Sequence, residues 1–294
     1  MVQHLDVHRA ARAPASAPRP PDTLPKTITD ANGTTHFFEV YGSDPIIVSR
    51  GPPIIALPPP VIGTAMVFIP RATSLVEQVP MLVYYHGHNG SASIEDYIKA
   101  NKHRDFRPLL QSTKVVLVEP WGGHKSKFGD LASGAGLARL IDQAMSAALR
   151  LGPGARRVLG PTPRPQSLIL AGFSGGGATL RNVVIGSKAD YIHRLTEAWC
   201  LDCMYSGEGQ SWLDWARTGG NSGRTLRVRT STEEGTGSPR AQAKIIRDAA
   251  EHRRDPNIDI EKTTQAGHEQ LPSLFIQGWL SQPRATRAIG GTAP

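Results

Sequence analysis

The sequence predicts an α/β fold, in which helices cover both faces of a mostly parallel sheet and a β-rich segment comes first. From Pro80 onward, short apolar runs typical of buried strands alternate with amphipathic segments typical of helices. Before that, from Thr27 to Pro70, turn signals and prolines separate shorter runs that suit strands. A parallel sheet of this kind binds ligands at the carboxyl ends of its strands. A chain of 294 residues is long enough for one such domain.

The β-rich segment is expected to form three strands. The triplet Ala31-Asn32-Gly33 signals a turn before the first of them. Prolines at positions 52, 53 and 58–60 exclude a helix from the middle of the segment. The expected strands are His36–Tyr41, Ile46–Val48 and Gly63–Ile69.

The alternating part is expected to hold six strands and six helices, with a Pro/Gly/Arg linker over Gly152–Pro165. The expected strands are Met81–Tyr85, Lys114–Glu119, Leu168–Phe173, Glu197–Tyr205, Thr225–Thr230 and Ile258–Thr264. The expected helices begin near Ser93 and continue with Gly136–Leu149, Gly176–Ile185, Ser211–Arg217, Arg240–Glu251 and Leu271–Leu280. We therefore predict one α/β domain over residues 26–282. A disordered Ala/Pro/Arg-rich tail over 1–25 and a flexible tail over 283–294 flank it.

Charge and hydropathy narrow the class of protein. The net charge of +8 comes from isolated Arg and Lys residues, and no block of them resembles a nucleic-acid-binding patch. A weak attraction to anionic surfaces or polymers stays open. No stretch is long and apolar enough to span a bilayer, and the N-terminal segment lacks the apolar core of a signal peptide. We expect a cytoplasmic protein without nucleic-acid partners.

Metal and cofactor sites are not expected. Cys200 and Cys203 lie in a segment expected to be a strand, where residues three apart point to opposite faces. Two buried thiols are therefore favoured over a disulfide or a shared metal ion. His86 and His88 alternate on an extended segment and could chelate a metal, but no acidic or thiol partner is spaced to complete the site.

The most informative motif is Gly172-Phe173-Ser174-Gly175-Gly176, which follows an apolar run and precedes a small-residue helix start. A serine on a sharp strand-to-helix turn is the nucleophile elbow of serine hydrolases. That turn strains the serine backbone and leaves room only for very small neighbours, which Gly172 and Gly176 provide. Gly175 lets a substrate carbonyl approach the backbone. Ser174 is the predicted nucleophile.

A serine hydroxyl needs a base, and the base needs an acid that orients it. His268 follows the last expected strand and precedes the last helix, so it is the predicted base. Two positions compete for the acid. Asp202 ends the strand after the elbow helix, where burial requires a partner such as a histidine, whereas Glu233 and Glu234 lie in a Thr/Gly-rich loop. We favour Asp202 and keep the glutamates as the alternative.

The oxyanion of an acyl-transfer reaction needs backbone donors. The amide of Gly175 is one candidate, because it follows the nucleophile at a helix N-terminus. The amide of His88 is the other, since His86-Gly87-His88 follows a strand and resembles a His-Gly oxyanion motif. Trp121 and Phe173 are candidate substrate-binding walls by position, with packing against the sheet edge as the alternative.

These residues, in this order, resemble the α/β-hydrolase superfamily over roughly Thr64 to Leu280. The resemblance implies nucleophile, acid and base roles for Ser174, Asp202 and His268. Most members carry the acid after a later strand, whereas the pancreatic lipases place it where Asp202 stands here. About twenty residues, Ser206 to Arg224, occupy the place of the lid found in many members, which implies an open site suited to exposed or bulky esters.

Three functions are compatible with this pattern, because the fold alone does not determine activity. A serine carboxylic-ester hydrolase acting on a small-molecule or exposed polymeric ester is favoured. A serine peptidase or amidase would use the same residues but also needs a side-chain pocket that the sequence does not reveal. A catalytically inactive binding module is the third reading. The oligomeric state is not predicted.

Overall fold

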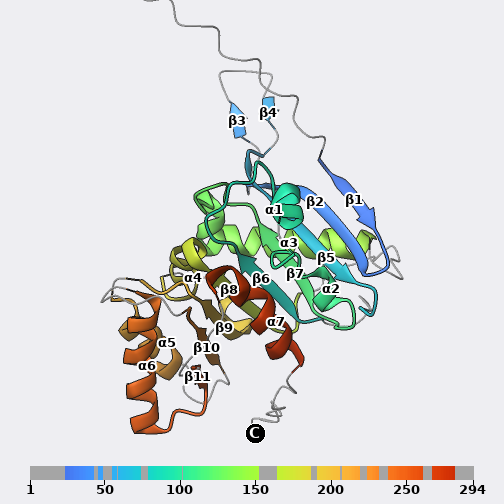
Figure 1. Cartoon of the computed structure of the whole chain (residues 1–294). Helices are drawn as coiled ribbons and strands as arrows, with labels where there is room; N and C mark the ends of the chain where they lie inside the picture. The colour runs from blue at the N-terminus through green and yellow to red at the C-terminus, as the bar shows by residue number, and fades with distance from the viewer. Residues whose placement is uncertain are drawn as a thin grey trace, which may run out of the picture.

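The computed structural model describes residues 24–42, 46–48, 55–57, 59–73, 79–100, 102–151, 164–186, 191–205, 207–218, 224–231, 238–260 and 267–281. Within these ranges, nine strands form one sheet in the order β1-β2-β5-β7-β6-β8-β9-β10-β11, and β3 pairs with β4 in a second, small sheet (Figure 1). Most of the predicted terminal tails lies outside the described residues, so the disorder expected there stays a prediction.

The large sheet has an antiparallel part and a parallel part. Its antiparallel strands are β1 (Lys26–Thr29), β2 (Gly33–Tyr41) and β5 (Val61–Pro70), and β5 also runs antiparallel to β7. The parallel strands are β6 (Met81–Tyr85), β7 (Val116–Pro120), β8 (Leu168–Phe173), β9 (Leu195–Leu201), β10 (Thr225–Arg229) and β11 (Ile258–Ile260). The small sheet pairs β3 (Ile46–Val48) with β4 (Ile55–Leu57).

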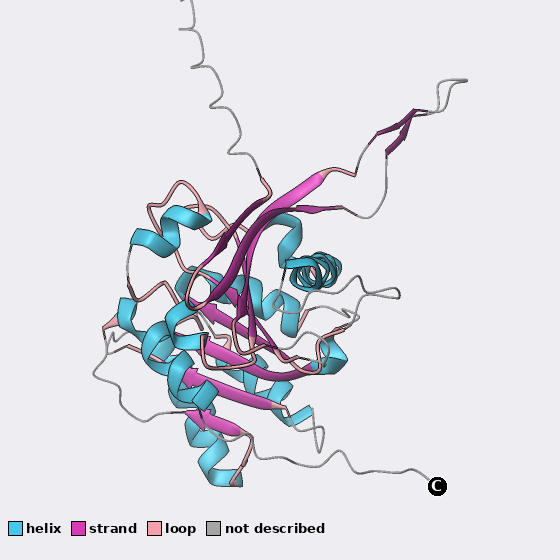
Figure 2. Ribbon diagram, turned by 90° about the vertical axis from the view of Figure 1, so that its right-hand side faces the viewer, coloured by secondary structure: helices cyan, strands magenta, loops and turns pink. Residues whose placement is uncertain are grey.

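Helices cover both faces of the sheet, as the sequence predicts (Figure 2). Side chains of α3 (Gly134–Leu151), α4 (Gly177–Val184), α5 (Gly209–Thr218) and α6 (Pro239–Arg253) share one buried cluster. Side chains of α1 (Ile94–Ala100), α2 (Arg107–Leu110) and α7 (Leu271–Ser281) share the other. Alternate residues of the strands enter opposite clusters: Met81 and Val83 of β6 enter the first, and Leu82 and Tyr84 enter the second.

The expected β6 and β8 have the observed ends, and most other predicted elements differ by a few residues. Two short strands, β1 and β4, and one short helix, α2, were not predicted from the sequence. Strand β1 is polar and exposed, β4 has three residues, and α2 is one turn long, so none carries a readable period. The strand expected over Ile258–Thr264 is described as far as Ile260, and residues 261–266 lie outside the described ranges. Most of the expected linker Gly152–Pro165 also lies outside them.

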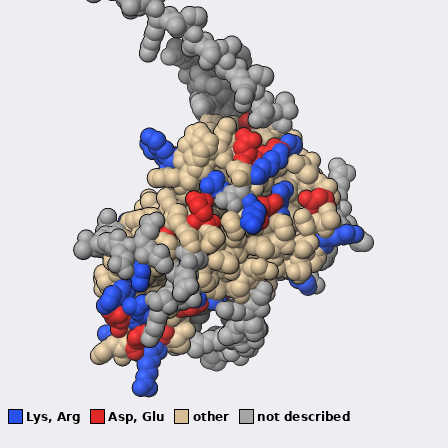
Figure 3. Space-filling view, in the orientation of Figure 1, with Lys and Arg blue, Asp and Glu red and all other residues tan. Residues whose placement is uncertain are grey.

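The surface that Figure 3 shows carries charges of both signs, and the described helices do not have the length and hydropathy of membrane spans. On the face that Figure 3 shows, Lys and Arg side chains lie beside Asp and Glu side chains. No helix among the described residues is long and apolar enough to cross a membrane. The cytoplasmic location and the lack of nucleic-acid partners stay predictions.

Candidate active site

The predicted nucleophile lies where β8 turns into a helix. Ser174 directly follows β8 and has a φ of +48°, a left-handed conformation that a serine rarely adopts. A short 3-10 turn, η2 (Ser174–Gly176), then leads into α4. A Cβ on Gly176 would lie 2.2 Å from the carbonyl oxygen of Tyr85, so only glycine fits between the elbow and β6. The strained strand-turn-helix that the motif requires is therefore present.

The structure brings together the predicted base and the favoured acid. His268 lies in η5 (His268–Gln270), directly before α7, and its Nδ1 is 2.6 Å from Asp202 Oδ2. The ring of His268 packs against Phe173, the residue before Ser174, with 4.6 Å between the ring centroids. The imidazole is thus held between a buried carboxylate and the strand end that carries Ser174. Glu233 and Glu234, the competing acids, lie outside the described residues.

Asp202 is buried but well supplied with donors. Only 3% of the residue is exposed, and Ser231 donates to its carboxylate from both the backbone N–H (3.2 Å) and the hydroxyl. The Asp202 N–H donates to the carbonyl of Arg229, at the end of β10. Together with His268 these donors satisfy a carboxylate that burial would otherwise penalise. The burial argument that favoured Asp202 holds, and its partner is the predicted histidine.

Sequence reasoning missed Ser231. It follows β10, the strand after Asp202's own, and parallel pairing of β9 with β10 sets the two strand ends side by side. Its position after a strand end was the available signal, but a serine there has no chemistry that distinguishes it from a turn residue. In the structure, Ser231 contributes two of the hydrogen bonds that hold the Asp202 carboxylate.

The expectation that Cys200 and Cys203 point to opposite faces is wrong. Strand β9 ends at Leu201 rather than at Tyr205, and Asp202 has a φ of +49°. This reversal turns Cys203 back into the same buried cluster as Cys200. Both thiols are free and buried, as predicted. Burial, and next the hydrogen bond with Cys203, raise the pKa of the Cys200 thiol well above its usual range.

The loop after β6 lies against the nucleophile. A Cβ on Gly87 would lie 2.8 Å from Ser174 Cβ, and the ring of His88 lies over Gly175, whose own Cβ would be 2.6 Å from His88 Cδ2. The two predicted oxyanion segments, at Gly175 and at His88, therefore meet beside Ser174. In the sequence these two segments follow different strands, β6 and β8, and the parallel pairing of the two strands brings the segments together.

His86 fixes the conformation of this loop from inside the protein. Its Nε2 accepts the Gly122 N–H (3.0 Å), which leaves Nδ1 as the protonated nitrogen, and Nδ1 donates to the Gly87 carbonyl (2.7 Å). Since the carbonyl and N–H of a trans peptide point in opposite directions, the N–H of His88 is directed away from His86. Burial lowers the pKa of His86 to about 4, so the ring is neutral near pH 7. His86 positions the loop, and among the described residues no three His, Cys, Asp or Glu side chains gather as metal ligands.

The two predicted substrate-binding walls differ in exposure. Phe173 is buried and supports the His268 ring. Trp121 is partly exposed, packs against His86 with 4.7 Å between the ring centroids, and lines a groove of about 780 Å³. The groove continues past the start of α1, at Ser93 and Asp96. Trp121 therefore contacts His86 of the loop after β6 and also lines this groove.

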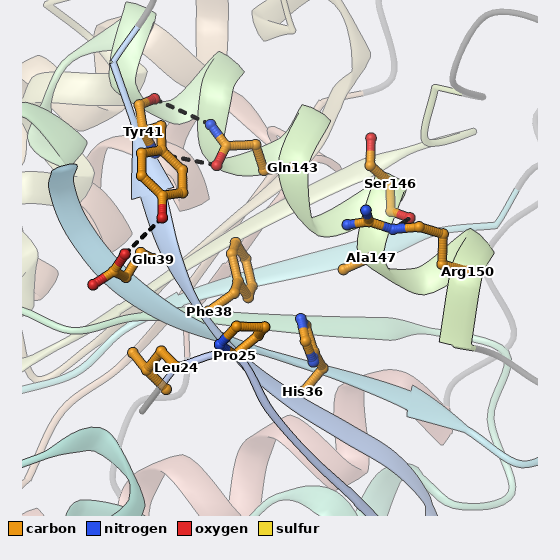
Figure 4. A pocket seen from close by; sticks show the side chains of 10 residues that line it. All are labelled: Leu24, Pro25, His36, Phe38, Glu39, Tyr41, Gln143, Ser146, Ala147 and Arg150. Carbon is orange, nitrogen blue, oxygen red and sulfur yellow. Dashed lines mark hydrogen bonds between the residues drawn. The ribbon is translucent and has the colours of Figure 1, made fainter. Parts of the chain in front are cut away.

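A smaller cavity of about 300 Å³ lies elsewhere, between β2 and α3 (Figure 4). Gln143 closes one end of it by bonding both the N–H and the carbonyl of Tyr41 at 3.1 Å. The residues that line it are Leu24, Pro25, His36, Phe38, Glu39, Tyr41, Gln143, Ser146, Ala147 and Arg150. None of these residues belongs to the loops around Ser174, so the cavity is separate from the candidate site.

The sheet order and the elbow are those of the α/β-hydrolase fold, and one solved structure with a TM-score of 0.50 supports this fold. An S-formylglutathione hydrolase from Agrobacterium tumefaciens matches with a TM-score of 0.50 at 10% identity, over 87% of this chain and 96% of that one. A feruloyl esterase module from Clostridium thermocellum, complexed with sinapinate, matches with a TM-score of 0.44 at 13% identity, over 87% and 86%. An esterase from Thermogutta terrifontis matches with a TM-score of 0.42 at 12% identity, over 74% and 86%. No protein-family model and no curated protein matches the sequence.

Proposed function

We propose that this protein is a serine hydrolase that cleaves carboxylic esters through an acyl-enzyme on Ser174. The observation that carries the proposal is the hydrogen bond between His268 and the buried Asp202, formed where the imidazole packs against Phe173, the residue before the left-handed Ser174. A buried carboxylate bonded to Nδ1 holds the proton on that nitrogen and keeps Nε2 unprotonated, the form that can act as a base. That arrangement supplies the base that a serine nucleophile needs.

The reaction would proceed in two halves. His268 takes the Ser174 proton while the serine oxygen adds to the ester carbonyl, and the carbonyl electrons move onto oxygen. The amides of Gly175 and His88 stabilise that oxyanion. Collapse of the adduct breaks the ester C–O bond, and His268 returns the proton to the departing alcohol. Water, activated by His268, then releases the acid by the same steps.

The substrate is proposed to be a small-molecule ester or an exposed ester on a polymer. Between β9 and β10 the described residues hold one short helix, α5, which is consistent with a site not covered by a lid domain. The Trp121 groove supports an extended or aromatic substrate part on the β5 side of the site.

The test is labelling with a fluorophosphonate probe followed by peptide mapping. Stoichiometric modification of Ser174, absent in Ser174→Ala and strongly slowed in His268→Ala, is the expected result. Parallel assays on p-nitrophenyl esters and peptide anilides separate an esterase from a peptidase. Folded wild-type protein that takes up no probe would refute the mechanism and favour a binding module.

A further inference from the structure

Ser126 carries a buried hydroxyl that the proposed reaction has not yet used. Only 6% of the residue is exposed, and its Oγ has no hydrogen-bond partner among the described residues. A buried donor without a partner costs roughly 1–3 kcal/mol, so each such group requires an explanation, and a catalytic role is one of those known. Its neighbours Lys125 and Lys127 are exposed, so the burial is particular to the serine.

The Ser126 backbone is strained in a way that directs the side chain inward. Its φ is +51°, which places a non-glycine residue in the left-handed region. Glycine would adopt this conformation at no cost, so a turn alone does not require a side chain here. Three other non-glycine residues of the described chain are left-handed: the proposed catalytic residues Ser174 and Asp202, and Arg254, which caps the end of α6.

The Ser126 hydroxyl faces the residue that carries the proposed oxyanion donor. A Cβ on Gly175 would lie 3.2 Å from Ser126 Oγ, and the ring of His88 borders the same space. The His88 ring and the Ser126 hydroxyl therefore both lie against Gly175, the residue that follows Ser174. Gly175 and His88 carry the expected amide donors, and Ser126 has a hydroxyl proton to donate.

The loop that carries Ser126 is held rigidly against the loop after β6. Asn89 donates from its backbone to the His124 carbonyl (3.0 Å) and from its side chain to the Gly123 carbonyl (3.3 Å). His86 accepts from Gly122, and the Ser126 N–H itself donates to Gly123 (3.3 Å). A donor fixed before the reaction stabilises developing charge without reorganisation, which is the condition for electrostatic catalysis.

We propose that the Ser126 hydroxyl is a third donor to the oxyanion formed when Ser174 adds to the ester carbonyl, an inference that rests on the proposed function. As the carbonyl electrons move onto oxygen, Ser126 Oγ–H donates a hydrogen bond to it alongside the Gly175 and His88 amides. No proton is transferred from Ser126. The bond is released when the carbonyl re-forms and the alcohol leaves.

The test compares Ser126→Ala, Ser126→Gly and a matched control. Thr73 also has a buried hydroxyl without a partner among the described residues. It lies shortly after β5, at the sheet edge opposite Ser174, because β5 runs antiparallel to β7. Both Ser126 variants should lower kcat on p-nitrophenyl butyrate roughly a hundredfold to a thousandfold with little change in KM. Thr73→Val should stay within about twofold of wild type in kcat.

A second readout isolates the oxyanion. A trifluoromethyl ketone forms a tetrahedral adduct on the serine, so its Ki should rise in both Ser126 variants by the factor that kcat/KM falls. Ser126→Gly relieves the backbone strain and should fold at least as stably as wild type. Retention of wild-type kcat by Ser126→Gly would overturn the proposal and assign Ser126 to the turn. Failure of fluorophosphonate to label Ser174 would instead refute the underlying hydrolase mechanism.

Discussion

Replacing Asp202 with Asn tests the arrangement around His268 most directly. Three donors converge on the Asp202 carboxylate: His268 Nδ1–H, the Ser231 N–H and the Ser231 hydroxyl. An amide has one acceptor oxygen in place of two. In one orientation its NH₂ group takes the place of Oδ2 and faces two donors, His268 Nδ1–H and the Ser231 hydroxyl. In the other orientation it takes the place of Oδ1 and faces one donor, the Ser231 N–H.

The magnitude follows from the tautomer. If the Asn NH₂ faces His268, Nδ1 becomes an acceptor and the proton moves to Nε2, which can then no longer accept the Ser174 proton. In serine proteases the corresponding change lowers kcat about 10⁴-fold. At about 1.4 kcal/mol per factor of ten, this raises the barrier by roughly 5 kcal/mol. Residual activity should rise toward high pH, where hydroxide replaces the missing base.

The assay is steady-state hydrolysis of p-nitrophenyl acetate between pH 6 and 10, for Asp202→Asn, Glu233→Gln and Glu234→Gln. The two glutamate variants should keep wild-type kcat. Circular dichroism melting verifies that each variant is folded. If Asp202→Asn keeps more than a tenth of wild-type activity while one glutamate variant loses it, the acid is that glutamate and the reasoning fails.

Three further predictions concern stability. Burial lowers the pKa of His86 from 6.5 to about 4, so between these pH values the unfolded chain binds more protons than the folded protein. The free energy of unfolding of the wild type should therefore fall by about 3 kcal/mol as the pH is lowered from 6.5 to 4. Urea unfolding should show no such loss in His86→Gln. Burial raises the pKa of Glu119 well above 4.5, so the free energy of unfolding should fall by about 1.4 kcal/mol for each pH unit of increase above 4.5, until the pKa of the folded protein is reached. If Glu119→Gln shows the same dependence of stability on pH as the wild type, this prediction is contradicted. In Gly177→Ala the new Cβ would lie 2.0 Å from the Cys203 carbonyl oxygen, so thermal melting should show a loss of about 1–3 kcal/mol. The control Gly278→Ala, with open space at its Cβ, should be stabilised by about 0.5–1 kcal/mol.

Local sequence patterns were sufficient to predict those strands and turns whose conformation depends on neighbouring residues in the chain. The buried strands β6 and β8 are uninterrupted apolar runs, so their ends could be read directly. The elbow at Ser174 follows from glycines adjacent to it in the sequence. Short or polar elements such as β1 and α2 carry no period, and their formation depends on the sheet and helices they pack against.

The end of β9 shows where local reading fails. The run from Glu197 to Tyr205 is apolar enough to be one strand, yet the strand stops at Leu201 because Asp202 turns out of the sheet toward Ser231 and His268. Those partners lie 29 and 66 residues further along the chain. No pattern within the segment could indicate a turn that depends on partners so distant.

The sequence by itself determined the α/β class and the strand-turn-helix at Ser174, and it predicted the side chains proposed for acyl transfer, because these depend on residue type and near neighbours. The sequence left the partner of His268 open between Asp202 and the two glutamates and gave no role to Ser126, and the tertiary structure showed the contacts of Asp202 and Ser126. Parallel pairing of β7, β6, β8 and β9 sets the loops after these strands at one sheet edge, where Ser126 lies against Gly175. At the same edge Asp202 meets His268, which precedes α7. Contacts between residues far apart in the chain are set by strand order and register, which only the folded sheet specifies.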